Sequence, residues 1–310
     1  MILFTAVRFH LYITEGVIVT FLNTLILCTF IRSKQFREKK EYVLIAGLSL
    51  ADALNGAGTA GIGWHRIHVS RGEQVTRWSC FFLLPMQLLI HSSMAQALMF
   101  LVISLDRFLS VFFPLVYFGF GRVYAFVLVS AAFLLPMVKW GFGLASVWHS
   151  DSGPNVSAMC YFPSALSSRV YDLSFLVQVL TAVASVVVYV AVMWQYRKHV
   201  TQVATVAYGG ENMEQHQNRL TLSLGLSCIC TLLLYVLPYT VMMLRLSGSV
   251  QAVLLANLNP MCNFFIYLKR HRGNSNGPAY HVLLQNRWSK PNRLGAGGGA
   301  GGNRDGSLSA

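Results

Sequence analysis

The acidic and histidine side chains are the candidates for acid–base or metal chemistry, and they are too scattered to form a catalytic group. The chain has 11 Asp and Glu residues and 9 His residues, and no two histidines stand four residues apart with a third ligand near by. Ser92 and Ser93 follow His91, but adjacency in sequence is not the geometry of a catalytic triad. The residues therefore predict neither enzyme activity nor a cofactor.

Two opposite charges, Asp106 and Arg107, end an apolar run and are followed by Pro114. A charge at the end of a membrane helix is costly unless it lies at the interface or is paired. Adjacent charges of opposite sign can meet both conditions. We therefore expect this pair to mark the boundary between a membrane helix and water.

Asp52 stands near the middle of another apolar run, where a carboxylate is expensive and by default functional. Asn23 and Asn259 lie near the middle of two further runs, and we expect them to be its partners. The alternative is that Asp52 is a protonated or hydrogen-bonded packing residue. Pro238 and Pro260 each leave a backbone carbonyl without its helical donor, so both are expected to kink their helices.

These residues lie on long apolar segments, and the composition is that of a membrane protein. Hydrophobic residues make up 55% and charged residues 11% of the 310 residues, whereas soluble domains have about 25% charged residues. Seven segments come close to the length of about 20 residues that crosses a bilayer: 11–31, 42–64, 80–106, 123–147, 170–194, 220–244 and 250–268. The sequence predicts an all-α membrane protein, with a seven-transmembrane helix bundle over residues 1–268 and a cytoplasmic, largely disordered tail over residues 269–310.

The second segment contains a glycine-rich run, N-G-A-G-T-A-G, at 55–61. It superficially matches a dinucleotide-binding pattern, but that pattern needs a preceding strand and a following helix. Inside a membrane span, small residues let helix backbones approach closely. We therefore interpret the run as a helix-packing surface.

The basic residues predict the orientation of the bundle. On one side of the seven segments lie 17 of the 24 Lys and Arg residues, and on the other side seven. The basic side is expected to be cytoplasmic, which places the N-terminus outside and the C-terminus inside. The glycosylation sequon at Asn155 and the cysteines Cys80 and Cys160 then lie outside, where glycosylation occurs and disulfides persist. Because the net charge of +13 is explained by this distribution, no nucleic-acid partner is expected.

In this order, the motifs resemble those of rhodopsin-like (class A) G-protein-coupled receptors along nearly the whole seven-span length. The residues that carry the resemblance are Asn23, L-S-L-A-D ending at Asp52, Cys80, D-R-F at 106–108, P-L-V-Y from Pro114, Pro238 and N-P at 259–260. Two further stretches, R-W-S-C-F-F at 77–82 and N-P-M-C-N-F-F-I-Y-L-K-R at 259–270, are similar to the nematode Srsx-type chemoreceptors. The resemblance implies a plasma-membrane receptor that passes extracellular ligand binding to a heterotrimeric G protein.

The resemblance also implies roles for residues at the cytoplasmic end. Arg107 would be the coupling switch that pairs with Asp106 at rest and meets the G protein when active. Phe108 and Pro114 would belong to the same coupling surface. Tyr189 and Tyr267 would be the polar tyrosines of this end.

Two further groups of residues receive implied roles. Asp52 and Asn259, together with Asn23, would form a polar hub between the spans, with a sodium ion as a candidate occupant. Cys80 and Cys160 would form the disulfide that ties an outer loop to the third span.

The sequence narrows the class of ligand only by making two classes unexpected, retinal and biogenic amines. Opsins need a lysine where this chain has Val253, and biogenic-amine receptors need an aspartate where it has Leu89. Gln87, His91 and Gln96 are candidate contacts for a small molecule or a peptide. The alternative for each is a hydrogen bond to a neighbouring helix.

Departures from the family pattern leave two alternatives open. Val236 replaces the tryptophan expected two residues before Pro238, and only 22 residues separate Pro238 from Pro260. A non-signalling receptor paralogue is therefore one alternative. A small-solute transporter or channel is the other, but the inverted repeats and rings of charge typical of those proteins are not found in the sequence.

Overall fold

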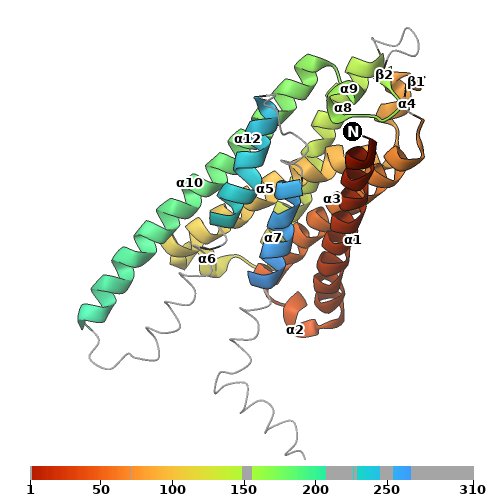
Figure 1. Cartoon of the computed structure of the whole chain (residues 1–310). Helices are drawn as coiled ribbons and strands as arrows, with labels where there is room; N and C mark the ends of the chain where they lie inside the picture. The colour runs from red at the N-terminus through yellow and green to blue at the C-terminus, as the bar shows by residue number, and fades with distance from the viewer. Residues whose placement is uncertain are drawn as a thin grey trace, which may run out of the picture. The chain divides into compact units, whose positions relative to one another are not determined.

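A computed structural model describes residues 2–70, 72–148, 156–206, 226, 229–244 and 254–266 as a bundle of long helices (Figure 1). Within these residues, five helical stretches are long and apolar enough to cross a membrane: Val7–Arg32, Lys40–His68, Leu84–Phe112, Arg122–Trp148 and Ser168–Gln195. Two shorter apolar helices follow, Ile229–Met242 and Leu254–Ile266. The prediction of an all-α membrane protein is confirmed, whereas the starts of the sixth and seventh predicted segments and the tail lie outside the described residues.

In chain order, the labelled elements are α1 (Ile2–Arg32), α2 (Lys34–Arg37), α3 (Lys40–His68), β1 (Gln74–Val75), α4 (Arg77–Phe81), α5 (Leu84–Phe112), α6 (Pro114–Gly119), α7 (Arg122–Leu134), α8 (Pro136–Trp148), β2 (Val156–Ser157), α9 (Phe162–Ala165), α10 (Ser168–Val206), the π-helical turn η1 (Leu232–Val236) and α12 (Leu237–Met243).

Prolines set helix boundaries that the apolar pattern did not predict. The third segment was expected to begin at Cys80, but Cys80 lies on the short helix α4, and α5 begins at Leu84 with Pro85 in its first turn. Proline is favoured there because the first N–H groups of a helix have no acceptor within it. Pro136 likewise divides the fourth segment into α7 and α8.

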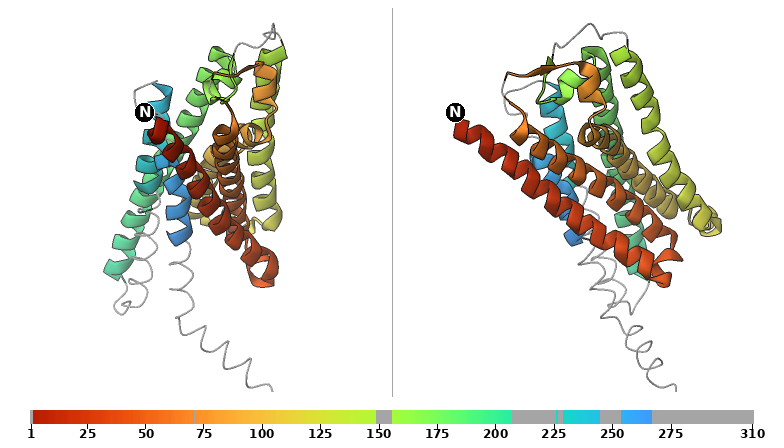
Figure 2. Two further views of the ribbon diagram at one scale, coloured as in Figure 1. Left: turned by 45° about the vertical axis from the view of Figure 1, so that its right-hand side comes forward. Right: turned by 90° about the vertical axis from the view of Figure 1, so that its right-hand side faces the viewer.

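Helix α3 is the most enclosed of the membrane-spanning helices. Of its apolar window, 72% is buried, against 22% for the first span and 17% for the span formed by α7 and α8. It packs against α1, α5 and α7, and Figure 2 shows α1 running along it. The exposed apolar side chains of α1, α7 and α8 are those expected to face lipid.

The contact between α1 and α3 is a backbone contact made possible by glycine. A Cβ atom on Gly16 would lie 2.5 Å from the amide nitrogen of Ala60, and one on Gly56 would lie 2.7 Å from Thr20 Oγ1. The Thr20 hydroxyl lies 3.3 Å from the Ala53 carbonyl, to which it donates a hydrogen bond across the interface. The interpretation of the glycine-rich run as a packing surface is therefore confirmed.

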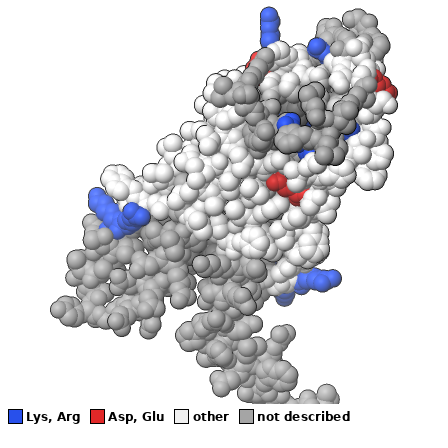
Figure 3. Space-filling view, in the orientation of Figure 1, with Lys and Arg blue, Asp and Glu red and all other residues white. Residues whose placement is uncertain are grey.

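Charged side chains are concentrated toward the ends of the bundle. On the face drawn in Figure 3, Lys and Arg gather near the two ends, and most of the surface between them is uncharged. This is the distribution expected for a bundle whose middle is surrounded by hydrocarbon.

Gly16→Val is expected to destabilise the bundle, because the added methyl groups would overlap the α3 backbone. Overpacking of this kind costs about 1–3 kcal/mol, measurable as a lower midpoint of thermal unfolding in detergent. Gly141→Val is the matched control, since a Cβ on Gly141 meets no atom within 4 Å. Equal losses in the two variants would contradict the close contact between α1 and α3.

Candidate functional site

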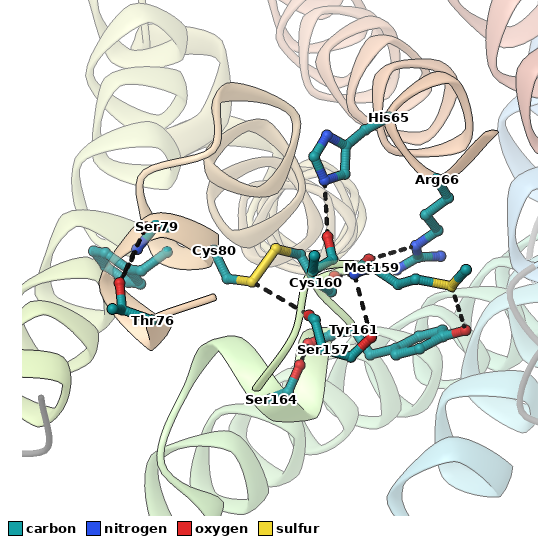
Figure 4. Close-up of a disulfide and its surroundings, with 12 residues drawn as sticks. His65, Arg66, Thr76, Ser79, Cys80, Ser157, Met159, Cys160, Tyr161 and Ser164 are labelled. Atoms are coloured by element: carbon teal, nitrogen blue, oxygen red, sulfur yellow. Dashed lines mark hydrogen bonds between the residues drawn. A yellow bond between two sulfur atoms is a disulfide. The ribbon is translucent and has the colours of Figure 1, made fainter. Parts of the chain in front are cut away.

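One end of the bundle, here called the disulfide end, is closed by a short segment around Cys160 (Figure 4). Cys80 and Cys160 form a disulfide with their Cα atoms 5.2 Å apart, which is the pair implied by the resemblance. Strand β1 pairs antiparallel with β2, with Gln74 opposite Ser157. Cys160 has a φ of 48°, a value that residues with a side chain rarely adopt, so the surrounding contacts must hold it there.

Two residues at the end of α3 supply those contacts. The His65 ring donates from Nε2 to the Ala158 carbonyl at 3.0 Å. Arg66 donates from Nε to the Met159 carbonyl at 3.0 Å and from Nη2 to the Cys160 carbonyl at 3.2 Å. Figure 4 shows both side chains reaching the segment that carries Cys160. Helix α3 and the disulfide therefore hold this segment together.

A cavity of about 100 Å³ lies next to Arg66. Residues from α1, α3, α5, α9, α10, α12 and the helix Leu254–Ile266 line it. Its polar lining consists of Tyr12, Asn55, Thr59, Arg66, Ser93, Tyr239 and Asn257, and the rest of the lining is apolar. An apolar cavity with a few convergent polar groups is the usual form of a small-molecule site.

Gln87 and His91, which the sequence offered as ligand contacts, do not line this cavity. Gln87 Oε1 accepts a hydrogen bond from Trp140 Nε1 at 2.6 Å, and its amide nitrogen donates to the Phe81 carbonyl. The His91 ring lies 6.1 Å from the ring of Phe133. The alternative of a hydrogen bond to a neighbouring helix is the one observed for Gln87.

Asp52 is fully enclosed and is paired with Gln96, not with the expected asparagines. Gln96 Nε2 donates to Asp52 Oδ1 at 2.6 Å, which joins α3 to α5. Asn23 donates to the Val19 carbonyl of its own helix at 3.0 Å. Both amide atoms of Asn259 are buried without a hydrogen-bond partner among the described residues. The three predicted hub residues are all buried, but the bond that engages the carboxylate comes from Gln96, which the sequence offered as a ligand contact with a bond to a neighbouring helix as the alternative.

A second set of polar contacts links four helices beside this pair: α1, α3, α5 and the helix Leu254–Ile266. Asn55 Nδ2 donates to Asn257 Oδ1 at 3.3 Å, and Asn257 Nδ2 donates to Glu15 Oε2 at 3.3 Å. The Ser92 hydroxyl donates to Asn55 Oδ1 at 3.4 Å. Asn257 is therefore the connection between α3 and the carboxylate of α1.

A sodium ion at Asp52 stays a prediction, since the one contact observed at Asp52 Oδ1 among the described residues is an amide N–H group. Gln96 supplies this group, whereas a cation would require oxygen ligands. No group of three His, Cys, Asp or Glu side chains that could hold a metal occurs in the part of the chain that the structure describes. The geometry is that of an amide paired with a carboxyl group.

The π-helical turn η1 stands directly before Pro238. Proline has no N–H group and its ring clashes with the carbonyl four residues earlier, so a wider turn accommodates it. Tyr235 on this turn donates from its hydroxyl to the Ser93 carbonyl of α5 at 2.9 Å. It also accepts a hydrogen bond from Gln178 Nε2 of α10 at 3.0 Å. Pro260, by contrast, lies within the continuous helix Leu254–Ile266.

At the opposite end, here called the Arg107 end, Arg107 lies between two carboxylates. Its Nη2 lies 3.5 Å from Asp106 Oδ2, and its Nη1 lies 3.3 Å from Glu41 Oε1 on α3. The Asp106 side chain is fully buried, whereas that of Glu41 is 39% exposed. The sequence predicted the first partner and missed the second, because Glu41 stands in a basic stretch.

Helix α6 holds Asp106 from the other side. The Tyr117 hydroxyl donates to Asp106 Oδ2 at 3.2 Å. Burial and the nearby Asp106 raise the pKa of Tyr117 far above its ordinary value, so the phenol stays protonated and keeps donating. Lys40 Nζ lies 3.4 Å from the centre of the Tyr117 ring and donates to the Tyr117 carbonyl at 2.7 Å. The short helix is thereby fixed to both α3 and α5.

The remaining predicted residues fall into two groups. Phe108 stacks on Phe112 with ring centres 4.2 Å apart, Pro114 begins α6, and Tyr189 lies on α10. Tyr267 and Asn155 lie outside the described residues.

The comparison with protein families decides what kind of bundle this is. A family model described as serpentine type 7TM GPCR chemoreceptor Srsx matches residues 16–273, which is most of the chain. The chain belongs to the Srsx family. No curated protein matches it. The resemblance drawn from the motifs is confirmed, and with it the seven-transmembrane fold of a G-protein-coupled chemoreceptor. A ligand and a G protein are the partners that membership in the family implies.

This Srsx receptor uses several residues that the motifs alone did not indicate. Gln96 pairs with Asp52, Glu41 pairs with Arg107, and Asn257 bridges α3 and α1. Each of them lies on a predicted membrane segment or beside its end, but the sequence does not tell which way a side chain faces. A polar residue within an apolar run is the signal that marked Gln96 as a candidate contact and that could have found Asn257.

Gln96→Leu is expected to destabilise the receptor, because it leaves the Asp52 carboxyl group buried without its donor. Leaving such a group unsatisfied costs about 1–3 kcal/mol, measurable by thermal unfolding of purified receptor. In an Asp52→Leu background the same change should cost much less, since no carboxyl group remains to be satisfied. Additive losses would show that the two side chains do not interact.

Proposed function

We propose that this receptor lies in the plasma membrane with the disulfide end outside, and that it passes occupancy of the cavity to a heterotrimeric G protein at the Arg107 end. The orientation is supported by the positive-inside rule, since 17 of the 24 basic residues belong to the Arg107 end, the loops on its side and the tail. The disulfide between Cys80 and Cys160 supports the same assignment, because disulfides persist outside the cell.

The observation that carries the proposal is the position of Arg107 between Asp106 and Glu41. Both carboxylates hold the guanidinium away from solvent, and only 16% of the Arg107 side chain is exposed. The group is available to a partner protein only after at least one of these contacts opens. The arrangement is therefore a resting state that release of Arg107 would end.

Helix α6 offers a docking surface beside this switch. Leu115 is 90% exposed and Phe118 is 92% exposed, and the Tyr117 between them holds Asp106. Exposed apolar side chains that lie next to a polar switch suit a partner protein that contacts both. Because Tyr117 connects the two, docking on α6 and release of Asp106 would be coupled.

The cavity is connected through Ser93 and Tyr239 to α5, the helix that carries Arg107. Both residues line the cavity, and Tyr235 bonds the Ser93 carbonyl while its ring lies 4.6 Å from the ring of Tyr239. A ligand that moves Tyr239 therefore acts on the π-turn before Pro238 and on α5, the helix that carries Arg107. Helix movement of this kind is a common two-state element in switching proteins.

Glu41→Gln is the direct test, because it removes one of the two charges that hold Arg107 at rest. A partly exposed ion pair is worth about 0.2–1 kcal/mol, so basal nucleotide exchange on a promiscuous G protein should rise by a factor of about 1.4 to 5. Arg107→Ala in the same background should return exchange to or below the starting level. Exchange is measured in membranes with equal surface expression of each variant.

Glu38→Gln is the matched control, since Glu38 makes an exposed ion pair with Lys34 at 3.9 Å near the same end. It is expected to leave basal exchange unchanged. If Glu41→Gln behaves like Glu38→Gln, the resting role of the Glu41 contact is wrong. No exchange in any variant, with the receptors folded at the surface, would favour the non-signalling paralogue.

A further inference from the structure

The cavity at the disulfide end has an unusual charge environment. Of the residues that line it, Arg66 is the one with a formal charge. The hydrogen bonds of Arg66 go to the carbonyls of Met159 and Cys160, and its guanidinium lies 4.7 Å from the centre of the Tyr161 ring. Carbonyls and an aromatic ring orient a cation but do not neutralise it.

Arg66 has no carboxylate partner within the described ranges. The ion pairs there involve Lys34 and Arg107, both near the opposite end. A half-buried guanidinium without a counter-ion is costly in a low-dielectric environment. An anion that entered the cavity would remove that cost.

A second cation lies behind the cavity wall. Lys139 of α8 has its Nζ buried without a hydrogen-bond partner among the residues described. Its ammonium group lies 5.6 Å from the centre of the Phe162 ring, and Phe162 lines the cavity. Two cations on different helices thus contribute positive potential to the same space.

Glu15 is the carboxylate bonded to the cavity-lining residue Asn257. Glu15 is not among the lining residues, and its Oε2 accepts a hydrogen bond from Asn257 Nδ2 at 3.3 Å. Asn257 is the residue that lines the cavity, and its Oδ1 is already engaged by Asn55. The cavity is therefore bordered by a cation and by amide and hydroxyl groups.

We propose that the cavity binds a small organic carboxylate, with Arg66 as the group that receives its negative charge. The inference rests on the proposed function, because it takes the cavity to be the ligand site of the receptor. The carboxylate would accept from the guanidinium of Arg66 and from neighbouring hydroxyls, and its apolar body would lie against Ile62, Met86 and Leu89. Arg66 would also transmit binding to the loop that it holds.

The volume limits the size of the ligand. A buried cavity of about 150 Å³ accommodates benzene, which has six non-hydrogen atoms. A cavity of about 100 Å³ therefore admits roughly four or five such atoms at the same density. Acetate and propionate, with about four and five non-hydrogen atoms, fall in this range, and butyrate, with about six, exceeds it.

The test measures binding without signalling. Purified receptor in nanodiscs is titrated with sodium propionate, with propionamide and with propylammonium chloride at constant ionic strength, and the thermal unfolding midpoint is followed. Ligands this small bind at best in the micromolar range, so concentrations up to about 30 mM are needed for saturation. Propionate is expected to raise the unfolding midpoint in a saturable manner. Neither propionamide, which is uncharged, nor propylammonium, which is cationic, is expected to raise it.

Three variants locate the effect. Arg66→Gln should weaken propionate binding at least about tenfold, whereas Arg66→Lys keeps the charge and should retain more of the affinity. Arg169→Gln is the matched control, because Arg169 is an exposed arginine at the start of α10 and does not line the cavity. Leu89→Phe should block binding by filling the cavity, and it leaves the contacts of Arg66 with the loop intact.

Because Arg66 also holds the loop, each variant is checked for the Cys80–Cys160 disulfide by mass mapping. Equal stabilisation by propionamide, propylammonium, chloride or phosphate would overturn the proposal, as would a failure of acetate and propionate to bind. Unchanged binding by Arg66→Gln or by Leu89→Phe would also overturn it. Propionate binding together with an inactive Arg107 end would instead show that the cavity proposal holds and the coupling proposal fails.

Discussion

Helix α3 is enclosed by other helices over most of its length, and a membrane offers no water to the polar groups that it carries. Asp52, Asn55 and Thr59 are all buried on it, so each needs a hydrogen-bond partner within the protein. Gln96 satisfies Asp52, Asn257 satisfies Asn55, and Thr59 bonds back to the carbonyl of Asn55. The glycines of the α1 interface bring the helices close on one side, and these polar bonds fix the other side. The rotation of α3 about its own axis is thereby determined.

That rotation also places the charged residues at the two ends of the helix. At one end, Glu41 meets the guanidinium of Arg107. At the other end, Arg66 meets the backbone carbonyls of the loop. The two arginines differ in what surrounds them, since Arg107 is compensated by carboxylates and Arg66 by dipoles alone. A cation that is paired with carboxylates, such as Arg107, suits a contact of the resting state. A cation without a paired carboxylate, such as Arg66, suits the binding of an anion.

Much of the fold was predictable from the sequence, because apolar segments of membrane-spanning length are recognised from the order of the residues without knowledge of tertiary contacts. The burial of Asp52, the pairing of Arg107 with Asp106 and the packing role of the glycine-rich run followed from the cost of polar groups and the size of side chains. The partners Gln96 and Glu41 did not follow, because a partner depends on how neighbouring helices are rotated and crossed. Cys80 was assigned to the third span, since the apolar pattern continues across the break that Pro85 introduces. Gln87 and His91 were predicted as ligand contacts because the sequence does not show which face of α5 borders the cavity.

The disulfide joins residues 80 positions apart, and in water the closure of a loop this long would stabilise a protein by about 4–5 kcal/mol through the entropy of the unfolded chain. Here the closed loop contains two of the apolar helices, Leu84–Phe112 and Arg122–Trp148. A bilayer already restricts both helices before the bundle assembles, so little of that chain entropy is left for the bond to remove. The stabilising effect is then concentrated on the segment around Cys160. In a membrane the disulfide therefore acts mainly by holding the segment around Cys160 in place at the disulfide end. Its reduction should free this segment while the helices stay assembled.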